Sequence, residues 1–326
     1  MKLSLSHSTW RTYSAAWSSF YTFTLQCGLA SLPLSDTVVQ LYVTQAASRL
    51  RYRTIKVYLA ALKFINTYHG FDSSHVWTDQ LHYLLRGIRR MQALTFPPTT
   101  PRIPITPAHL RLLLQFVRDA HSPADAACFR AAFTLAFFGL LRVSEFTCPG
   151  PRLFDAGQHL STLDIRFSNN PRMMHVRIKV SKTDPFRLGC TIRVASTGNS
   201  LCPVNAMRAY LRVRPPILGP LFLFQDGSYL TRSRMQAVLA QTFPFATPGS
   251  MGTHSFRIGG ASMLCSLGVP DATVQLLGRW SSDAFRRYLH VSDQFLTLIH
   301  QRASSCPMSF ARIWHPSSGT SKPRDK

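Results

Sequence analysis

Two stretches near the C-terminal end of the chain decide its fold: THSFRIGG at residues 253–260 and LGRWSSDAFRRY at residues 277–288. With Thr253 as its N-cap, the first stretch predicts a helix that carries His254 and Arg257 at positions i and i+3. Residues with this spacing project from one face of a helix. Two cation-forming side chains aimed at one point suit a phosphate group.

The second stretch predicts another short helix, capped by Ser281 or Ser282. On this helix Phe285, Tyr288 and Leu289 share one side, so Tyr288 is expected to be held firmly. Taken singly, these residues have ordinary structural explanations: a core histidine, a surface arginine and an aromatic residue on an apolar face. The combination of the two stretches points to a site.

The charge of the chain indicates a polyanionic partner. Its 326 residues include 37 Lys and Arg against 14 Asp and Glu, which gives a formal net charge of +23. Most of this excess is arginine, whose planar guanidinium binds phosphate oxygens in pairs, and this favours nucleic acid over a membrane surface. No apolar run approaches the roughly 20 residues that span a bilayer, and residues 1–10 lack a signal-peptide core. We therefore expect a soluble intracellular protein.

The seven cysteines are odd in number, scattered along the chain and never paired as C-x-x-C. This pattern supports neither a disulfide framework nor a zinc cluster. Buried free thiols are the expected state, and no metal site is predicted.

Four amphipathic helices are predicted in residues 1–95, starting near Ser8, Ser35, Tyr52 and Thr78. In the fourth, the residues expected to face inward are Leu81, Leu85, Ile88 and Met91. Two basic clusters lie in this bundle: Arg49, Arg51, Arg53 and Lys56, and then Arg86, Arg89 and Arg90. Solvated helix faces are the ordinary explanation, but the charge of the chain favours contact with a DNA backbone.

Residues 96–106 carry four prolines, too many for a helix and suited to a stiff connector. The predicted organisation is a helical bundle at 1–95, a linker at 96–106, a second domain at 107–302 and a disordered tail at 303–326. The tail is rich in Ser, Pro, Gly and charge and has no periodicity.

The second domain opens with a helix at 107–120, and a nearly all-apolar helix at 126–141 marks its buried centre. Arg142 follows directly, so its charge must be paired or must face a cleft. Glu145 is the obvious partner. An Arg–Glu pair that merely closes a helix is the alternative explanation.

A β-hairpin is predicted from alternation at 175–180 and 187–194, with Lys182 at its tip. Further elements are a helix at 203–213, a short buried strand at 221–224 and a helix at 231–243. The fold class expected is mainly α with a small β component.

The order of these motifs resembles the tyrosine recombinases, the phage-integrase family. GLLRVSE at 139–145 is similar to the first family box, SKTD at 181–184 to the hairpin that carries a mobile catalytic lysine, and residues 254–257 with Tyr288 to the C-terminal signature. Lys179 is the alternative lysine. Where the family places His or Trp after the Gly of its last box, this chain has Arg279 followed by Trp280, and the sequence does not decide between them.

The resemblance implies an N-terminal, SAM-like core-binding domain and an α+β catalytic domain that close around double-stranded DNA. It also implies catalytic roles for Arg142, Lys182, His254, Arg257 and Tyr288, with Glu145 in support. Arg142 and Arg257 would hold the phosphate, His254 would take the tyrosine proton and Lys182 would protonate the leaving 5′-hydroxyl. Neither a metal nor a small-molecule cofactor is implied.

The implied assembly is a homotetramer on synapsed DNA. The 279–285 run is similar to recombinases of the Crypton and DIRS mobile elements, and in a eukaryotic host such an enzyme works in the nucleus. Two alternatives remain: a catalytically silent, domesticated DNA-binding protein, and an enzyme like a type IB topoisomerase.

Overall fold

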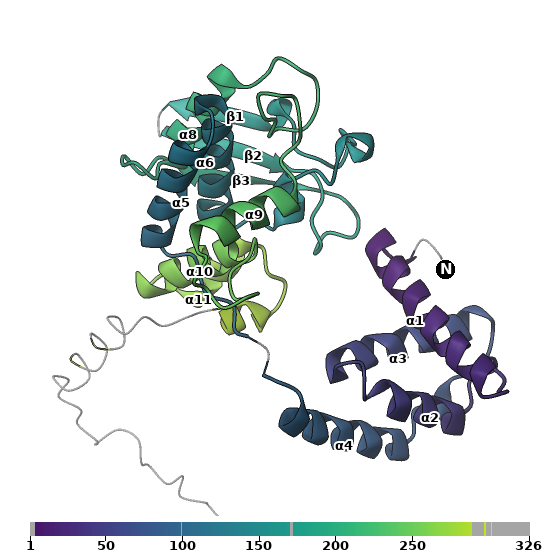
Figure 1. The fold of residues 1–326 in the computed structure, drawn as a ribbon. Coiled ribbons are helices and arrows are strands. Elements are labelled where there is room, and N and C mark those ends of the chain that lie inside the picture. Colours follow the sequence, from purple (N-terminus) through teal and green to yellow (C-terminus); the bar gives the residue numbers. More distant parts are fainter. Residues whose placement is uncertain (1–3, 99, 170–171, 289–296, 298–300, 302–326) are drawn as a thin grey trace, which may run out of the picture. The chain divides into compact units, whose positions relative to one another are not determined.

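The computed structural model describes residues 4–98, 100–169, 172–288, 297 and 301. The chain divides into two compact units, Met1–Thr99 and Thr100–Lys326, whose elements are labelled in Figure 1. The division falls inside the predicted linker 96–106, and the predicted tail 303–326 lies outside the described residues. The chain is mainly helical with one small sheet, which confirms the predicted fold class. None of the helices in the described ranges is long and apolar enough to cross a membrane.

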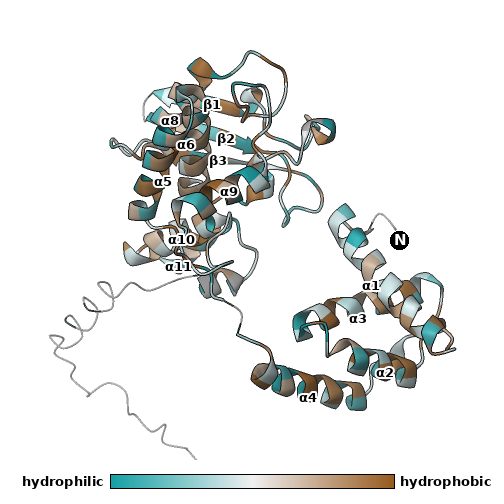
Figure 2. Cartoon of the chain, viewed as in Figure 1, coloured by the Kyte–Doolittle hydropathy of each residue, from teal (hydrophilic) through white to brown (hydrophobic). Residues whose placement is uncertain are grey.

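The first unit is a helical bundle. Its elements are α1 (His7–Gln26), α2 (Asp36–Ala46), α3 (Tyr52–Tyr68), the 3-10 turn η2 (Ser74–Val76) and α4 (Asp79–Thr95). Figure 2 shows hydrophobic and hydrophilic residues alternating along α4, as an amphipathic helix requires. The four helices bury one apolar core, in which the rings of Phe20 and Tyr42 meet edge to face with centroids 5.2 Å apart.

One residue predicted to face this core does not. Met91 is 44% exposed, and its neighbour Gln92 is buried instead. The Gln92 side chain accepts a hydrogen bond from the Tyr52 backbone N–H at 2.7 Å and donates to the carbonyls of Ala47 and Leu50, each at 2.8 Å. The sequence pattern misplaced Met91 because a polar residue took the inward position to satisfy backbone groups between α2 and α3.

The second unit is built on α6 (Pro123–Phe138), whose residues from Cys128 to Phe137 are buried except Arg130. Helices α5 (Pro107–Ala120), α8 (Pro203–Val213) and α10 (Ser255–Ser266) pack against it, and α9 (Arg232–Thr242) packs on α5. The apolar run was predicted to stay helical to residue 141. It ends earlier, because Gly139 is the C-cap and Leu140 adopts a left-handed conformation with φ 48°.

A three-stranded antiparallel sheet completes the second unit, in the order β1 (Ile165–Asn169), β2 (Arg172–Ile178) and β3 (Cys190–Ala195). The β2–β3 pair corresponds to the predicted hairpin, whereas β1 was not predicted although its sequence alternates. Two 3-10 turns, η3 (Pro151–Leu153) and η4 (Thr162–Asp164), precede the sheet.

The prediction of a strand at 221–224 was wrong. Only one isolated bridge forms there, between Leu223 and Tyr229. The Tyr210 hydroxyl lies 3.0 Å from the carbonyl oxygens of Leu221 and Leu223 and accepts a hydrogen bond from the Leu223 N–H at 2.7 Å. A side chain therefore satisfies the backbone groups that a partner strand would otherwise pair.

The helix predicted with Thr253 as its N-cap begins one residue later than expected. His254 is the N-cap of α10, and the Ser255 N–H bonds to the Gly252 carbonyl at 2.8 Å, so a tight turn rather than the Thr253 side chain starts the helix. Gly259 lets α10 approach the extended segment before α5, since a Cβ there would lie 1.8 Å from the Ile105 carbonyl oxygen.

Helix α11 (Asp271–Gly278) follows α10, and the chain then forms η5 (Asp283–Tyr288), a 3-10 turn where a second short helix was expected. Phe285 is buried in a small cluster with Ala261 of α10 and Val274 of α11. This packing attaches η5 to the helix that carries Arg257. Leu289, predicted to share a side with Tyr288, lies outside the described residues.

Candidate active site

Arg142 stands at the start of α7 (Val143–Phe146), in the turn that follows α6. Its backbone N–H donates to Glu145 Oε2 and its Nη1 donates to Glu145 Oε1, both at 2.9 Å. The Glu145 side chain is 1% exposed and that of Arg142 is 17% exposed. The carboxylate thus holds the arginine while leaving part of the guanidinium accessible.

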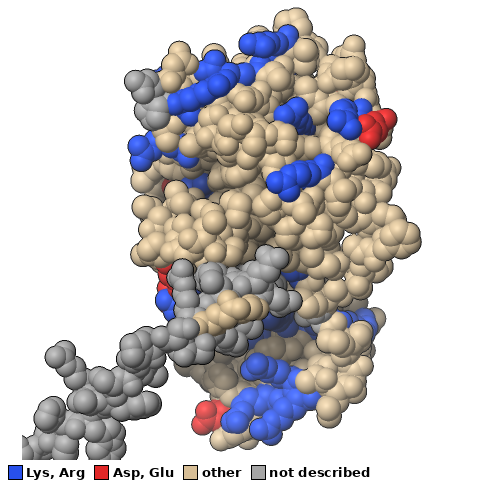
Figure 3. All heavy atoms as spheres, turned by 90° about the vertical axis from the view of Figure 1, so that its left-hand side faces the viewer, with Lys and Arg blue, Asp and Glu red and all other residues tan. Residues whose placement is uncertain are grey.

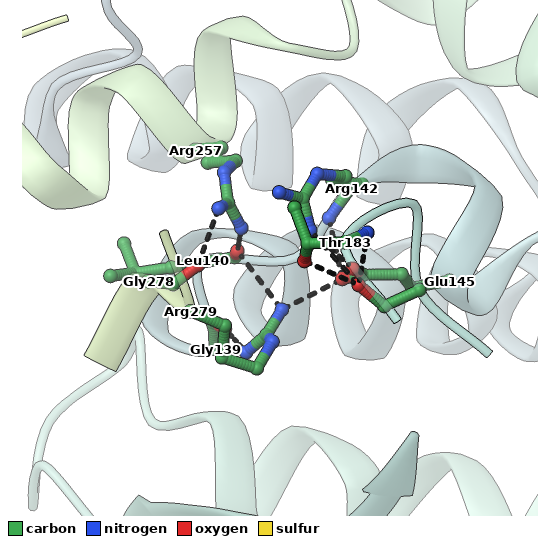
Figure 4. Close-up of polar contacts among 9 residues, drawn as sticks. Gly139, Leu140, Arg142, Glu145, Thr183, Arg257, Gly278 and Arg279 are labelled. Atoms are coloured by element: carbon green, nitrogen blue, oxygen red, sulfur yellow. Dashed lines mark hydrogen bonds and ion pairs between the residues drawn. The ribbon is translucent and has the colours of Figure 1, made fainter. Parts of the chain in front are cut away.

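Arg279, from a segment much later in the sequence, contacts the same carboxylate. It is the left-handed C-cap of α11, with φ 56°, and its Nη2 lies 2.7 Å from Glu145 Oε2. Its side chain also donates to the carbonyls of Gly139 and Leu140, at 3.3 and 3.5 Å. Its Nε is buried and has no hydrogen-bond partner among the described residues. Figure 4 shows Arg142 and Arg279 both pointing toward the Glu145 carboxylate.

Arg257, on the first turns of α10, is 1% exposed. Its two Nη atoms donate to the carbonyls of Leu140 and Gly278, and its guanidinium lies 4.1 Å from the centre of the Trp280 ring. Both carbonyls belong to residues at helix ends, where no intrahelical donor is available. Arg257 therefore joins the end of α6 to the end of α11, and it shares the Leu140 carbonyl with Arg279 (Figure 4).

The Trp280 ring contacts two residues of this region. One of them is the Arg257 guanidinium, and the other is the Phe285 ring, with ring centroids 5.5 Å apart and an angle of 34° between the planes. A Cβ on Gly278 would fall 1.6 Å from this ring, so the glycine before Arg279 is required for the tryptophan to pack here. Arg279 and Trp280 thus occupy different places, one on Glu145 and one on Arg257.

His254 precedes α10 and is electrostatically coupled to the arginines. Burial, followed by the charges of Arg257, Arg142 and Arg102, lowers the pKa of His254 to about 4. The imidazole is therefore neutral at pH 7, the form that accepts a proton. Sequence analysis missed Arg102. It lies in the proline-rich segment, and no pattern distinguishes it from other exposed arginines, but a Cβ on Gly252 would lie 2.7 Å from its Nη1.

Lys182 lies in the loop between β2 and β3, and its side chain is exposed. The preceding residue ties this loop to the site, because the Ser181 hydroxyl accepts a hydrogen bond from Arg142 Nη1 at 3.3 Å. The alternative, Lys179, is engaged elsewhere. Its Nζ lies 2.6 Å from Asp164 Oδ2 and donates to the carbonyls of Ala156 and His159.

Tyr288 is the last residue of η5, and the position of its side chain lies outside what the structure describes. The backbone of η5 is held against α10 through Phe285. The structure therefore brings together Arg142, Glu145, His254, Arg257 and Arg279, and places the Lys182 loop beside Arg142. The contact of Tyr288 with this group stays a prediction.

The seven basic residues singled out in the first unit all have exposed side chains: Arg49, Arg51, Arg53, Lys56, Arg86, Arg89 and Arg90. Arg51 donates to the Pro97 carbonyl at 3.0 Å and lies over the Phe96 ring, and Arg89 lies over the Tyr52 ring. On the face drawn in Figure 3, Lys and Arg side chains are far more frequent than Asp and Glu. The surface is thus suited to a polyanion.

No protein-family model and no curated protein matches the sequence. Solved structures do. The XerH site-specific recombinase bound to a palindromic difH substrate, in a post-cleavage complex, aligns at 18% identity and a TM-score of 0.63, over 90% of this chain and 79% of that one. The Tn1549 transposon integrase in complex with transposon right end DNA aligns at 16% identity and a TM-score of 0.61, over 92% and 95%.

A lambda integrase dimer bound to a COC′ core site aligns at 12% identity and a TM-score of 0.54, over 88% of this chain and 72% of that one. At these identities the likeness concerns the arrangement of the backbone, and it spans both units. The chain therefore has the two-domain fold of the tyrosine recombinases and integrases.

Proposed function

We propose that this chain is a site-specific DNA recombinase or integrase that cuts and rejoins DNA strands through a 3′-phosphotyrosine. One observation supports this above the others. Arg142, Arg257 and Arg279 come from separate segments and meet around the Glu145 carboxylate and the Leu140 carbonyl. Cations held in this way stabilise the negative charge that develops on a phosphate under attack.

In the proposed reaction the Tyr288 oxygen attacks the phosphorus of a DNA phosphodiester. A bond forms between this oxygen and phosphorus, and the bond from phosphorus to the 5′-oxygen breaks. His254, neutral at pH 7, accepts the tyrosine proton, and Lys182 donates a proton to the departing 5′-oxygen. The 3′-phosphotyrosine keeps the bond energy, so a second 5′-hydroxyl joins by the reverse steps without a cofactor.

Arg142 and Arg279 are our candidates for direct contact with the phosphate. Both side chains are partly exposed, and Arg279 carries its charge beside Arg142 on Glu145, whereas the Trp280 ring lies against Arg257. This favours Arg279 over Trp280 as the residue that takes the role of the His or Trp in the last sequence motif of the family. In the described geometry Arg257 holds the ends of α6 and α11, so its predicted phosphate contact requires one of its N–H groups to turn toward the DNA.

The partner proposed is double-stranded DNA, bound by both units, with a homotetramer on synapsed sites. The solved structures of this fold named above hold DNA, and the net charge of +23 suits such a partner. We further propose that the chain serves a mobile element, with the Crypton and DIRS groups as candidates, and that it acts in the nucleus if the host is eukaryotic.

The first rival function is a silent DNA-binding protein. It would share the fold and the charge but would have no reason to keep two arginines on one buried carboxylate with a third beside them. The second is an enzyme like a type IB topoisomerase, which would relax supercoiled DNA as a monomer without sequence preference. A covalent adduct excludes the first rival, and dependence of that adduct on one selected sequence excludes the second.

The test is a suicide substrate. A cognate duplex is first selected from random DNA by its binding to the full chain. A nick is then placed near the cleavage point, so that the short cleaved fragment diffuses away and the enzyme is trapped. We expect a protein–DNA adduct that survives denaturant. Tight binding of the selected duplex without any adduct would leave only the DNA-binding function.

A further inference from the structure

The open face of the three-stranded sheet carries a row of basic side chains that the proposed active site does not use. Arg166 of β1 pairs with His175 of β2, which pairs with Arg193 of β3. Directly paired residues of antiparallel strands project from the same face. The core face is made of the alternate residues, such as Val176 and Val194, which are buried. The row therefore crosses the sheet on the side away from the core.

A fourth basic residue, Arg177, extends this row along β2, two positions from His175 and on the same face. Neighbouring strands lie about 4.8 Å apart and residues i and i+2 about 7 Å apart. The four side chains thus originate from an area about 10 Å by 7 Å. We call the open face defined by Arg166, His175, Arg177 and Arg193 the basic sheet face.

In the part of the chain that the structure describes, the three arginines of the basic sheet face are not tied up by other side chains or by backbone groups. Within the described residues, the guanidinium groups of Arg166, Arg177 and Arg193 form no hydrogen bond or ion pair. By contrast, Arg172 on the same strand donates to Asn205 at 2.8 Å. The nearby carboxylate of Asp164 is already held by Lys179 at 2.6 Å.

The closeness of these positive charges lowers the stability of the sheet. Like charges on neighbouring strands repel each other, and no acidic side chain described here offsets the repulsion. Three residues of the basic sheet face, Arg166, His175 and Arg177, line a hollow of about 630 Å³, to which the 156–164 segment also contributes. Ser168 and Thr191 add hydroxyl groups to its lining. A hollow with guanidinium and hydroxyl donors and an unbalanced positive charge is suited to phosphate oxygens.

We propose that the basic sheet face binds backbone phosphates of the DNA duplex outside the cleavage point. The inference rests on the proposed function, because it needs a duplex in the active site. Ser181, which contacts Arg142, lies six residues along the chain from His175, a distance of at most about 20 Å even in extended backbone. One duplex can therefore reach both the arginines of the active site and the row.

The length and charge of the row suit a DNA backbone. Arginine side chains that start about 10 Å apart on β1 and β3 can each contact a different phosphate of one strand, and several uncompensated positive charges favour a polyanion. Contacts of this kind carry no sequence information, so the face adds affinity and orientation rather than specificity.

The test compares two double variants of the full chain. Arg166→Gln with Arg193→Gln removes two charges from the basic sheet face. Arg118→Gln with Arg212→Gln removes two exposed charges from helices α5 and α8 and is the matched control. All the substituted side chains are exposed, so both proteins should fold, and circular dichroism melting checks this. Binding of a 40-base-pair duplex is measured by fluorescence anisotropy over a series of salt concentrations.

We expect the slope of log K against log salt to become shallower by about 1.8 in the first variant, since each lost phosphate contact removes about 0.9. The control should keep the wild-type slope. Adduct formation at saturating suicide substrate should be unchanged in both, because neither variant touches the active site. Equal slopes for the two variants would overturn the inference while leaving the proposed function intact.

Two further outcomes would also overturn it. If the wild-type chain binds no duplex, the proposed function itself fails and the inference fails with it. If inorganic phosphate shifts the NMR signals of the Arg166 and Arg193 side chains while the duplex does not, the face is a site for a small anion. Shifts induced by the duplex and absent in the Gln variant would support DNA contact.

Discussion

Arg279 and Glu145 form an ion pair of 2.7 Å although 134 positions separate them in the sequence. The second oxygen of the same carboxylate holds Arg142 at 2.9 Å. Glu145 is therefore the residue that positions two cations, and it does so with a side chain that is 1% exposed. Arg142 and Arg279 are thus held in place before DNA arrives.

The first prediction concerns this carboxylate. Glu145→Ala removes the anion and leaves two arginines close together without compensation, so we expect the free energy of unfolding to fall by about 3–5 kcal/mol. Glu145→Gln should lower the free energy of unfolding by less, because the amide oxygen still accepts a hydrogen bond. Urea unfolding measures both, and Ser144→Ala, at the exposed neighbour, is the control. A loss under about 1 kcal/mol for Glu145→Ala would show that the network is not structural.

The second prediction concerns pH. Because burial and the charges of Arg257, Arg142 and Arg102 lower the pKa of His254 to about 4, its Cε1–H NMR signal should titrate near pH 4. The unfolded chain binds the proton more readily, with a pKa of about 6.5. The contribution of His254 to the free energy of unfolding should therefore be constant above pH 6.5 and decrease as the pH falls from 6.5 to about 4.

His254→Gln should remove this part of the pH dependence, whereas His82→Gln, at an exposed position of α4, should not. Arg142→Gln should raise the pKa of His254, because one of the neighbouring positive charges is lost. A His254 signal that titrates near pH 6.5 in the DNA-free protein would contradict the described environment.

The third prediction uses two glycines. Gly259→Ala places a methyl group against the Ile105 carbonyl, 1.8 Å away before relaxation, so α10 must shift and stability should fall by several kcal/mol. Gly87→Ala, in α4, meets nothing within 4 Å and should raise stability by up to about 1 kcal/mol through helix propensity. Thermal melting of the two variants compares them directly. Equal effects would mean that α10 does not approach residue 105 so closely.

The fourth prediction separates the two candidate lysines. Lys182→Ala should leave stability unchanged and slow strand cleavage, because the 5′-oxygen then leaves without a proton. Lys179→Ala should lower stability, since it leaves the buried Asp164 carboxylate without its cation. A substrate with sulfur in place of the bridging 5′-oxygen needs no proton donor, so it should restore cleavage by the Lys182 variant. Without that rescue, Lys182 is not the acid.

Local patterns predicted the fold well. Helices α5 and α8 begin and end where the sequence placed them, because a proline at the first helical position and the apolar period agree there. The errors fall where side chains replace backbone partners. Tyr210 satisfies the carbonyls of residues 221 and 223, and Gln92 takes the place expected for Met91. No local pattern reports such long-range hydrogen bonds.

The site was predicted in part, and for a similar reason. The sequence paired Arg142 with Glu145, three residues away, and the structure confirms that contact. It left Arg279 and Trp280 undecided, because their partners Glu145 and Arg257 are distant in sequence. The Leu140 carbonyl accepts a hydrogen bond from Arg257 because α6 ends before residue 140. The apolar run, which continues to residue 141, gave no sign of that early end.

The central claim is that Tyr288 carries the DNA, and mapping the adduct tests it most directly. Trypsin should release the modified tyrosine in the peptide of residues 288–302, which lies between Arg287 and Arg302. After nuclease treatment of the adduct formed with the suicide duplex, mass spectrometry should find a nucleotide attached to Tyr288. Chelation of divalent metals should not change the yield.

Tyr288→Phe should form no adduct while it binds the selected duplex as tightly as the wild type, and Tyr229→Phe, the matched control in the same unit, should form it normally. An adduct that persists in the Tyr288→Phe protein, or a nucleotide attached to any other residue, would contradict the account.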